Sequence, residues 1–160
     1  MKKLRTATDL SQHDLSTLIQ ISKRSIAKIE LGNENLSVSK VNILLDFFNL
    51  SADDLSDGNL SIDHDLRDTL AAHHKTAHPE YTKSLTKKPG IVYAIDYKLL
   101  PSKFLTEPKQ IHDIKEYFAS LGWDFKSSSL TNALQRKPKQ IRWEKLGSVK
   151  DINLYSEITI

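Results

Sequence analysis

Residues 10–32, LSQHDLSTLIQISKRSIAKIELG, decide the fold of the first third of the chain. Apolar residues recur there at helical spacing in two short bursts, and a serine that can cap a helix precedes each burst. Ser11 is expected to cap a helix over residues 12–19, and Ser22 a second helix over residues 23–31. Gly32 supplies a left-handed stop. The stretch therefore predicts two short helices joined by a brief turn.

Three further short helices are expected around this pair. Leu4 and Ala7 indicate a helix before it, and Ser37 begins a helix after it whose apolar stripe includes Leu44 and Phe48. A fifth short helix is expected over residues 51–55. Five short helices with brief connections predict a compact all-helical domain over residues 1–58.

Charge is distributed unevenly over this domain. Residues 1–28 hold six lysines and arginines against two aspartates, whereas residues 29–60 hold one lysine against six acidic residues. The second helix of the pair is expected to have one apolar side and one polar side. Ile26 and Ile29 are expected to face inward and Lys23, Arg24, Ser25 and Lys28 outward. One end of the domain is therefore expected to face polyanions.

The two segments LSQHDL (residues 10–15) and ISKRSIAKIELG (residues 21–32) resemble the phage repressor and Cro family of helix-turn-helix proteins, and the resemblance extends to about residue 58. It implies that residues 23–31 are a recognition helix for the major groove of duplex DNA. It also implies that Gln12 begins the preceding helix and touches the DNA backbone. The sequence departs from the family pattern at Gln20, where a turn glycine is usual, and in the shortness of its first helix.

The residues expected to contact DNA fall into two groups. Lys23 and Arg24 can donate hydrogen bonds to guanine O6 and N7, and the basic N-terminus can add phosphate contacts. The first domain's expected contacts are Gln12, Ser22, Lys23, Arg24, Ser25 and Lys28, with Lys2, Lys3 and Arg5 on phosphates.

The middle of the chain is expected to connect two domains. Residues 56–65 are polar and acidic, a short helix is expected over residues 62–74, and residues 75–90 are expected to form a connection. Together, residues 59–90 are predicted to be a helix and linker. Four histidines fall in this part of the chain, but the absence of cysteine and the presence of Pro79 favour an exposed helix end over a zinc site. No metal or cofactor is expected.

The last segment, residues 91–160, is expected to combine helices with a β-hairpin. Residues 91–100 fit the spacing of a helix or of a strand, and a helix is favoured because the following segment needs a helical partner. Further helices are expected from a cap at Thr106 to Gly122 and from a cap at Ser127 to Arg136. Two strands over residues 141–145 and 149–155 are expected to form a hairpin. The fold class is therefore mainly α, with a five-helix helix-turn-helix domain followed by a small winged-helix-like α+β domain.

A second DNA contact is expected in this segment. Residues 126–150 hold seven lysines and arginines against Glu144 alone. Asn132 and Arg136 are expected to face a groove, and Arg142 and Lys150 to hold phosphates. The alternative is a packing or dimerisation domain that binds protein. The aromatic residues Trp123, Phe125, Trp143 and Tyr155 are expected in its core.

The sequence thus predicts a transcriptional repressor that binds double-stranded DNA as a homodimer. An antitoxin-like protein, whose C-terminal domain binds a protein partner, is the main alternative. A nucleic-acid enzyme is disfavoured, because no phosphate loop, nucleophile motif or paired catalytic acids are evident. Without a long apolar run or a signal peptide, the chain is expected to be cytoplasmic with no membrane contact.

Overall fold

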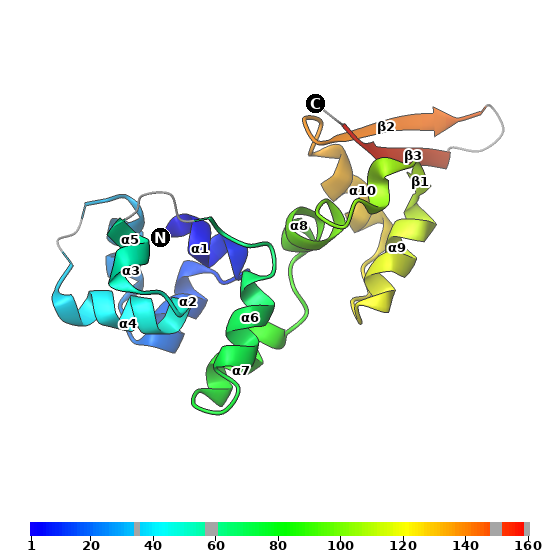
Figure 1. The fold of residues 1–160 in the computed structure, drawn as a ribbon. Helices are drawn as coiled ribbons and strands as arrows, with labels where there is room; N and C mark the ends of the chain where they lie inside the picture. Colours follow the sequence, from blue (N-terminus) through cyan, green and yellow to red (C-terminus); the bar gives the residue numbers. More distant parts are fainter. Residues whose placement is uncertain (34–35, 57–60, 148–151, 159–160) are drawn as a thin grey trace. The chain divides into compact units, whose positions relative to one another are not determined.

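The computed structural model divides the chain into two compact units, residues 1–87 and residues 88–160. It describes residues 1–33, 36–56, 61–147 and 152–158. Helices dominate both units, and the described strands lie in the second (Figure 1). The expected fold class, mainly α with a small α+β part at the C-terminus, is confirmed.

In unit 1, residues 1–87, the described residues form seven short helices. Their bounds are α1 Lys2–Ala7, α2 Gln12–Ile19, α3 Lys23–Glu30, α4 Val38–Phe48, α5 Ala52–Ser56, α6 Leu66–His73 and α7 Pro79–Thr86. The first five helices lie where the sequence predicts them, and the bounds expected for α2, α3 and α5 agree to within one residue. The two-helix pattern of residues 10–32 is therefore confirmed as α2 and α3.

Serine caps explain where three of these helices begin. The Ser11 hydroxyl accepts a hydrogen bond from the Asp14 amide at 3.0 Å, and the Asp14 carboxylate accepts one from the Ser11 amide at 2.9 Å. This reciprocal pair satisfies two backbone donors at once. The Ser22 and Ser37 hydroxyls each accept one hydrogen bond, from the Ser25 and Lys40 amides, at the starts of α3 and α4. Gly32 has φ +74, as expected for its left-handed stop.

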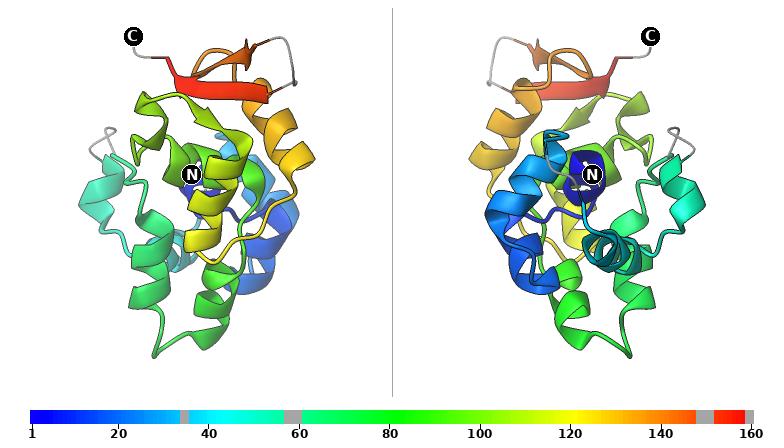
Figure 2. Two further views of the ribbon diagram at one scale, coloured as in Figure 1. Left: turned by 90° about the vertical axis from the view of Figure 1, so that its right-hand side faces the viewer. Right: turned by 90° about the vertical axis from the view of Figure 1, so that its left-hand side faces the viewer.

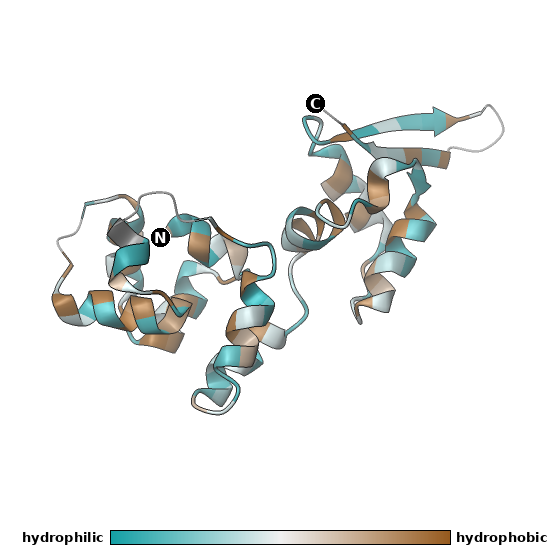
Figure 3. Cartoon of the chain, viewed as in Figure 1, coloured by the Kyte–Doolittle hydropathy of each residue, from teal (hydrophilic) through white to brown (hydrophobic). Residues whose placement is uncertain are grey.

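The core of unit 1 gathers one apolar face from each of several helices. In Figure 3 brown apolar segments alternate with teal polar ones along these helices, as amphipathic helices require. Leu15, Ile26, Phe47 and Leu70 are each almost fully buried. The buried cluster comprises Leu4, Leu10, Leu15, Ile19, Ile21, Ile26, Leu44, Phe47, Phe48, Leu70, Ala71 and Leu85.

This core extends well past the expected boundary at residue 58. Leu70 and Ala71 of α6 and Leu85 of α7 pack into it, so both helices belong to unit 1. The expectation that residues 75–90 form a connection is wrong, because α7 occupies residues 79–86. Pro79 stands at its start, where a missing N–H costs nothing, and the single buried leucine anchors it. Residues 57–60 of the expected boundary lie outside the described part.

Unit 2, residues 88–160, combines helices with a small sheet. In chain order it contains α8 Ile91–Ala94, the π-helical segment η1 Ile95–Leu99, the 3-10 turn η2 Phe104–Thr106, β1 Lys109–Gln110, α9 Ile111–Ser120, α10 Ser127–Gln135, β2 Ile141–Leu146 and β3 Ile152–Glu157. The expected helical character of residues 91–100 is confirmed.

The sheet has the strand order β1-β3-β2, and both pairings are antiparallel. In Figures 1 and 2, α9 and α10 lie on one side of it. Tyr155 of β3 is fully buried in one cluster with Phe118 and Leu134 of these helices. Two strands at the expected places are confirmed, although Ser148, Val149 and Lys150 lie outside the described residues.

Three details of unit 2 differ from expectation. Thr106 does not cap α9, because it ends η2 and is followed by β1, and Gln110 is the N-cap of that helix, with its amide donating to the Asp113 carboxylate. Lys126, and not Ser127, is the N-cap of α10, and its side chain makes no capping hydrogen bond. Trp143 is 43% exposed, because β2 extends past the edge of the core.

Candidate nucleic-acid interface

The helix α3 has one buried side and one polar side. Ile26 is fully buried, and Lys23, Arg24 and Lys28 are exposed. Because residues 24 and 28 are four apart, their side chains lie one above the other on the same face of the helix. The expected division of this helix is therefore present, with Ser25 and Ile29 half-buried at its margin.

The first turn of α3 is held by two side-chain contacts. The Ser22 hydroxyl accepts a hydrogen bond from the Ser25 amide at 3.2 Å. The ammonium group of Lys40 on α4 donates to the Ser25 hydroxyl at 3.3 Å. Ser22 and Ser25 thus have structural partners within unit 1, and Lys40 places a further cation beside this turn.

The other end of α3 is fixed by Glu30. Its Oε1 lies 2.7 Å from Arg5 Nε and its Oε2 lies 3.1 Å from Arg5 Nη2. The Gln12 amide donates to Oε2 at 2.8 Å. The side chains of Arg5 and Glu30 are only 12% and 4% exposed. Glu30 therefore connects α1 and α2 to the end of α3.

Electrostatics keep Glu30 ionised in this position. Burial by itself raises the pKa of the carboxyl, but hydrogen bonds from Arg5 and Gln12 and the charges of Arg5 and Lys2 outweigh it and lower the pKa below its ordinary 4.5. The charge of Glu30 offsets that of Arg5, so neither contributes much field beyond the domain.

The expectation that Arg5 holds a phosphate is wrong. Its remaining nitrogen, Nη1, donates to the Leu10 carbonyl at 2.7 Å, so all three of its donor groups are directed inward. No local pattern indicates this role, because Arg5 and Glu30 are twenty-five residues apart. Lys2 and Lys3 are exposed on α1, and the Gln12 amide has Glu30 as its partner.

The turn between α2 and α3 contains a left-handed residue. Gln20 has φ +55, in the region that glycine adopts without cost. This is the position where the sequence departs from the resembled family, and a residue with a side chain adopts this left-handed conformation less readily than glycine does. The buried neighbours Ile19 and Ile21 hold the turn in place.

Histidines gather elsewhere in unit 1, around a buried ring that the sequence did not single out. His74 is 3% exposed, its Nε2 lies 2.8 Å from the Phe47 carbonyl oxygen, and its ring stacks on Phe47. His78 stacks on Tyr81 nearby. Burial lowers the pKa of His74, and the neighbouring charges of His73 and His78 lower it further. The exposed helix end that is expected for these histidines is therefore wrong for His74.

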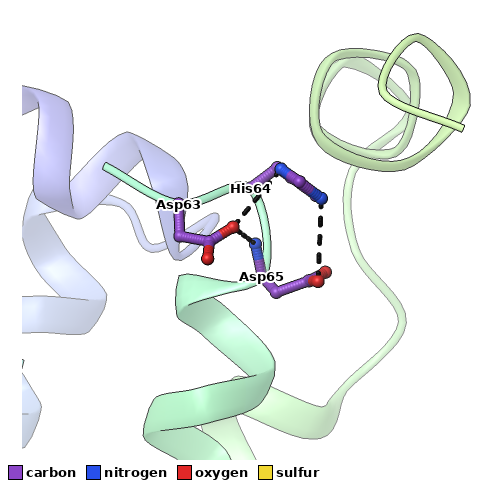
Figure 4. A group of neighbouring side chains, drawn as sticks. All are labelled: Asp63, His64 and Asp65. Atoms are coloured by element: carbon purple, nitrogen blue, oxygen red, sulfur yellow. Dashed lines mark hydrogen bonds and ion pairs between the residues drawn. The ribbon is translucent and has the colours of Figure 1, made fainter. Parts of the chain in front are cut away.

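A different cluster, Asp63, His64 and Asp65, offers three ligand atoms within 4.8 Å of one another (Figure 4). All three residues are exposed. The Asp65 amide donates to the Asp63 carboxylate at 3.1 Å, and His64 Nδ1 lies 3.3 Å from that carboxylate. These contacts order the start of α6, and they account for the arrangement without a metal ion.

In unit 2 the expected contact residues lie on two neighbouring elements. Asn132 of α10 and Arg136 at its C-terminal end line a groove of about 500 Å³, together with Ile91 and Val92 of α8. Arg142 is exposed on β2, which packs against α10. Lys137 also lines the groove, but its ammonium group pairs with Asp96.

Comparison with known proteins identifies the first unit. The helix-turn-helix family matches residues 1–55, which include α1 to α4 and most of α5. No curated protein and no solved structure matches the chain.

The family is one of DNA-binding regulators and not of enzymes. Among the residues that the structure describes, no helix is both long enough and apolar enough to cross a membrane. Residues 1–55 form a helix-turn-helix domain of the phage repressor and Cro type, and the protein is a DNA-binding transcription regulator.

Proposed function

We propose that this protein is a repressor that recognises a specific operator through α3 and acts by occupying it. The observation that carries the proposal is the exposed set Lys23, Arg24 and Lys28 on a helix whose opposite side is buried at Ile26. Both ends of that helix are fixed, by Ser22 and by Glu30. A rigid helix with donors on its outer side can enter a major groove about 12 Å wide.

Base reading falls to the first turn of α3. Arg24 can donate two hydrogen bonds to O6 and N7 of one guanine, and Lys23 can donate to the same edge. Ser22 and Ser25 lie in the same turn and contribute hydroxyl groups there. Lys28, one turn further along, is placed for a phosphate or a neighbouring base.

Phosphate contacts position the domain on the duplex. Lys2 and Lys3 are exposed on α1, and Gln12 stands at the start of α2 with its amide held by Glu30. Contacts to phosphates carry no sequence information, but they set the register of the recognition helix on the duplex. The start of α2 also favours a phosphate through its backbone dipole.

The proposal includes a homodimer. One recognition helix reads only a few base pairs, which is too little to select a site among many competitors. Two copies whose recognition helices lie about 34 Å apart read two half-sites on one side of the duplex. We assign much of the dimer interface to residues after 60.

The test is a titration of the full chain with a mixed-sequence duplex at several salt concentrations. Because the binding surface is cationic, log K should fall steeply and linearly with log salt, by about 0.9 for each phosphate neutralised. Sedimentation of the full chain should give a dimer. A flat salt response, or no binding at low salt, would remove the DNA-binding proposal.

The antitoxin-like alternative has one observation in its favour. Val92 is 61% exposed beside the groove of α8 and α10, as an anchor for a protein partner would be. That alternative requires a toxin-like reading frame beside the gene and a partner that co-purifies with the chain. Purification of the chain with that neighbouring product tests it directly.

A further inference from the structure

All of the chain's excess positive charge lies in unit 2, because the helix-turn-helix unit carries slightly more acidic than basic residues. Unit 1 holds eleven lysines and arginines against twelve acidic residues, whereas unit 2 holds twelve against eight. Residues 125–143 contain five lysines and arginines and no acidic residue. A long-range attraction to a polyanion therefore acts mainly on unit 2.

The helix α10 presents a donor-rich side within this acid-free segment. Leu130 and Leu134 are fully buried, and Asn132 and Arg136 are exposed on another side of the helix. Ser129, Asn132 and Arg136 follow one another at intervals of three and four residues, so they share one face. That face borders the groove of about 500 Å³ beside α8.

The strand β2 extends this surface away from the helix. Every residue from Arg142 to Leu146 is exposed. Arg142 and Glu144 stand 3.8 Å apart at 73% and 56% exposure, an ion pair too open to neutralise the arginine. Trp143 opposes the buried Tyr155 in the ladder but is itself 43% exposed.

We infer that unit 2 carries a second surface for duplex DNA, in which Asn132 and Arg136 of α10 face a groove and Arg142 on β2 holds the phosphate backbone. Lys126 and Lys139, both exposed within this segment, add phosphate contacts. Lys137 takes no part, because it is paired with Asp96. The inference rests on the proposed function, since it is the first unit that brings DNA to the chain.

Covalent linkage favours DNA over an acidic protein as the occupant. Unit 2 begins at Lys88, directly after the last residue of unit 1. Once unit 1 is bound, the neighbouring stretch of duplex is present at a high effective concentration. The surface of unit 2 would bind free DNA only weakly. In the full chain it adds to the affinity for the duplex that unit 1 already holds. The expected operator is longer than one helix-turn-helix domain needs, with two different elements for each subunit.

The experiment compares hydroxyl-radical footprints and salt dependence of the full chain. The test variant is Arg136→Glu with Arg142→Glu, and Arg136→Gln with Arg142→Gln removes the charges without reversing them. Lys103→Glu is the matched control, because it changes an exposed lysine of the same unit outside both elements. Circular dichroism checks that each variant folds.

We expect the wild-type protein and Lys103→Glu to protect the same long stretch of duplex. The double glutamate variant should protect a shorter stretch and lose at least tenfold in affinity. The double glutamine variant should bind more weakly than wild type, with the salt slope reduced by up to about 1.8, or about 0.9 for each phosphate that is no longer neutralised.

Equal footprints and equal salt slopes for all four proteins would overturn the second surface while leaving the proposed function intact. Capture of an acidic protein by wild type but not by the glutamate variant, with unchanged footprints, would also overturn it. If the wild-type protein protects no DNA at low salt, the proposed function itself is wrong.

Discussion

Arg5 and Glu30 form a two-point ion pair that joins the first helix to the end of the recognition helix, with nitrogen–oxygen distances of 2.7 and 3.1 Å. Gln12 adds a third hydrogen bond from α2. Three helices thus meet at one carboxylate. The position of α3 relative to α1 and α2, and hence the orientation of its exposed face, depends on that group.

Removal of Arg5 should destabilise unit 1 strongly. Arg5→Ala leaves the Glu30 carboxylate, 4% exposed, without its main counter-charge, and the expected loss is about 3 kcal/mol in the free energy of unfolding. Lys3→Ala, at an exposed cation on the same helix, should change stability by less than about 0.5 kcal/mol. Urea unfolding of the full chain measures both. Equal losses would show that the pair contributes little.

The same pair predicts an acid dependence. Because the folded pKa of Glu30 is lowered from 4.5, its stabilising contribution is complete above pH 4.5 and is lost as pH falls through the folded value. The stability difference between wild type and Glu30→Gln should therefore shrink as pH falls below 4.5. Urea midpoints measured from neutral pH down through that range test this. A difference that stays constant with pH would contradict it.

His74 predicts a second pH effect in a higher range. The folded pKa is lowered from 6.5, chiefly by burial, so the neutral ring contributes stability above pH 6.5 that is lost as pH falls below it. His74→Gln keeps a side-chain N–H toward the Phe47 carbonyl but cannot titrate. As pH falls through 6.5, the free energy of unfolding of His74→Gln should decrease less than that of wild type. His112→Gln, at an exposed position, should not have this effect. Identical profiles for both variants would refute this role.

Gln20 in the turn between α2 and α3 can be replaced with a gain in stability. Gln20→Gly should raise the free energy of unfolding by up to about 1 kcal/mol, because φ +55 strains a side-chain-bearing residue but not glycine. Asn49→Gly is the control, since asparagine tolerates its φ of +51 better. Thermal unfolding measures both, and a loss of stability at Gln20 would show that its side chain is needed.

Local patterns allowed the helix-turn-helix unit to be predicted from sequence. Ser11, Ser22 and Ser37 each precede a periodic apolar run, and cap and period together locate a helix to within a residue or two. The outward set Lys23, Arg24 and Lys28 follows from the same period, because Ile26 determines which side is buried.

Long-range pairing explains what local patterns did not reveal. The role of Arg5 depends on Glu30, and the burial of His74 depends on Phe47, each more than twenty residues away. The helix α7 was missed because only Leu85 is fully buried, and one apolar residue gives no period. Trp143 has an aromatic side chain typical of a core, but β2 extends past that core.

In the proposed function, operator recognition depends above all on the reading of base edges by Arg24 of α3, and selection of bound duplexes from a random-sequence pool tests this most directly. Wild type should enrich a defined motif. Arg24→Ala should bind that motif more weakly by roughly 1–3 kcal/mol and lose preference at one base pair, while Lys2→Ala should weaken all sequences about equally. If no motif is enriched, or if Arg24→Ala weakens every duplex uniformly, Arg24 contacts only phosphate and base reading by this residue is contradicted.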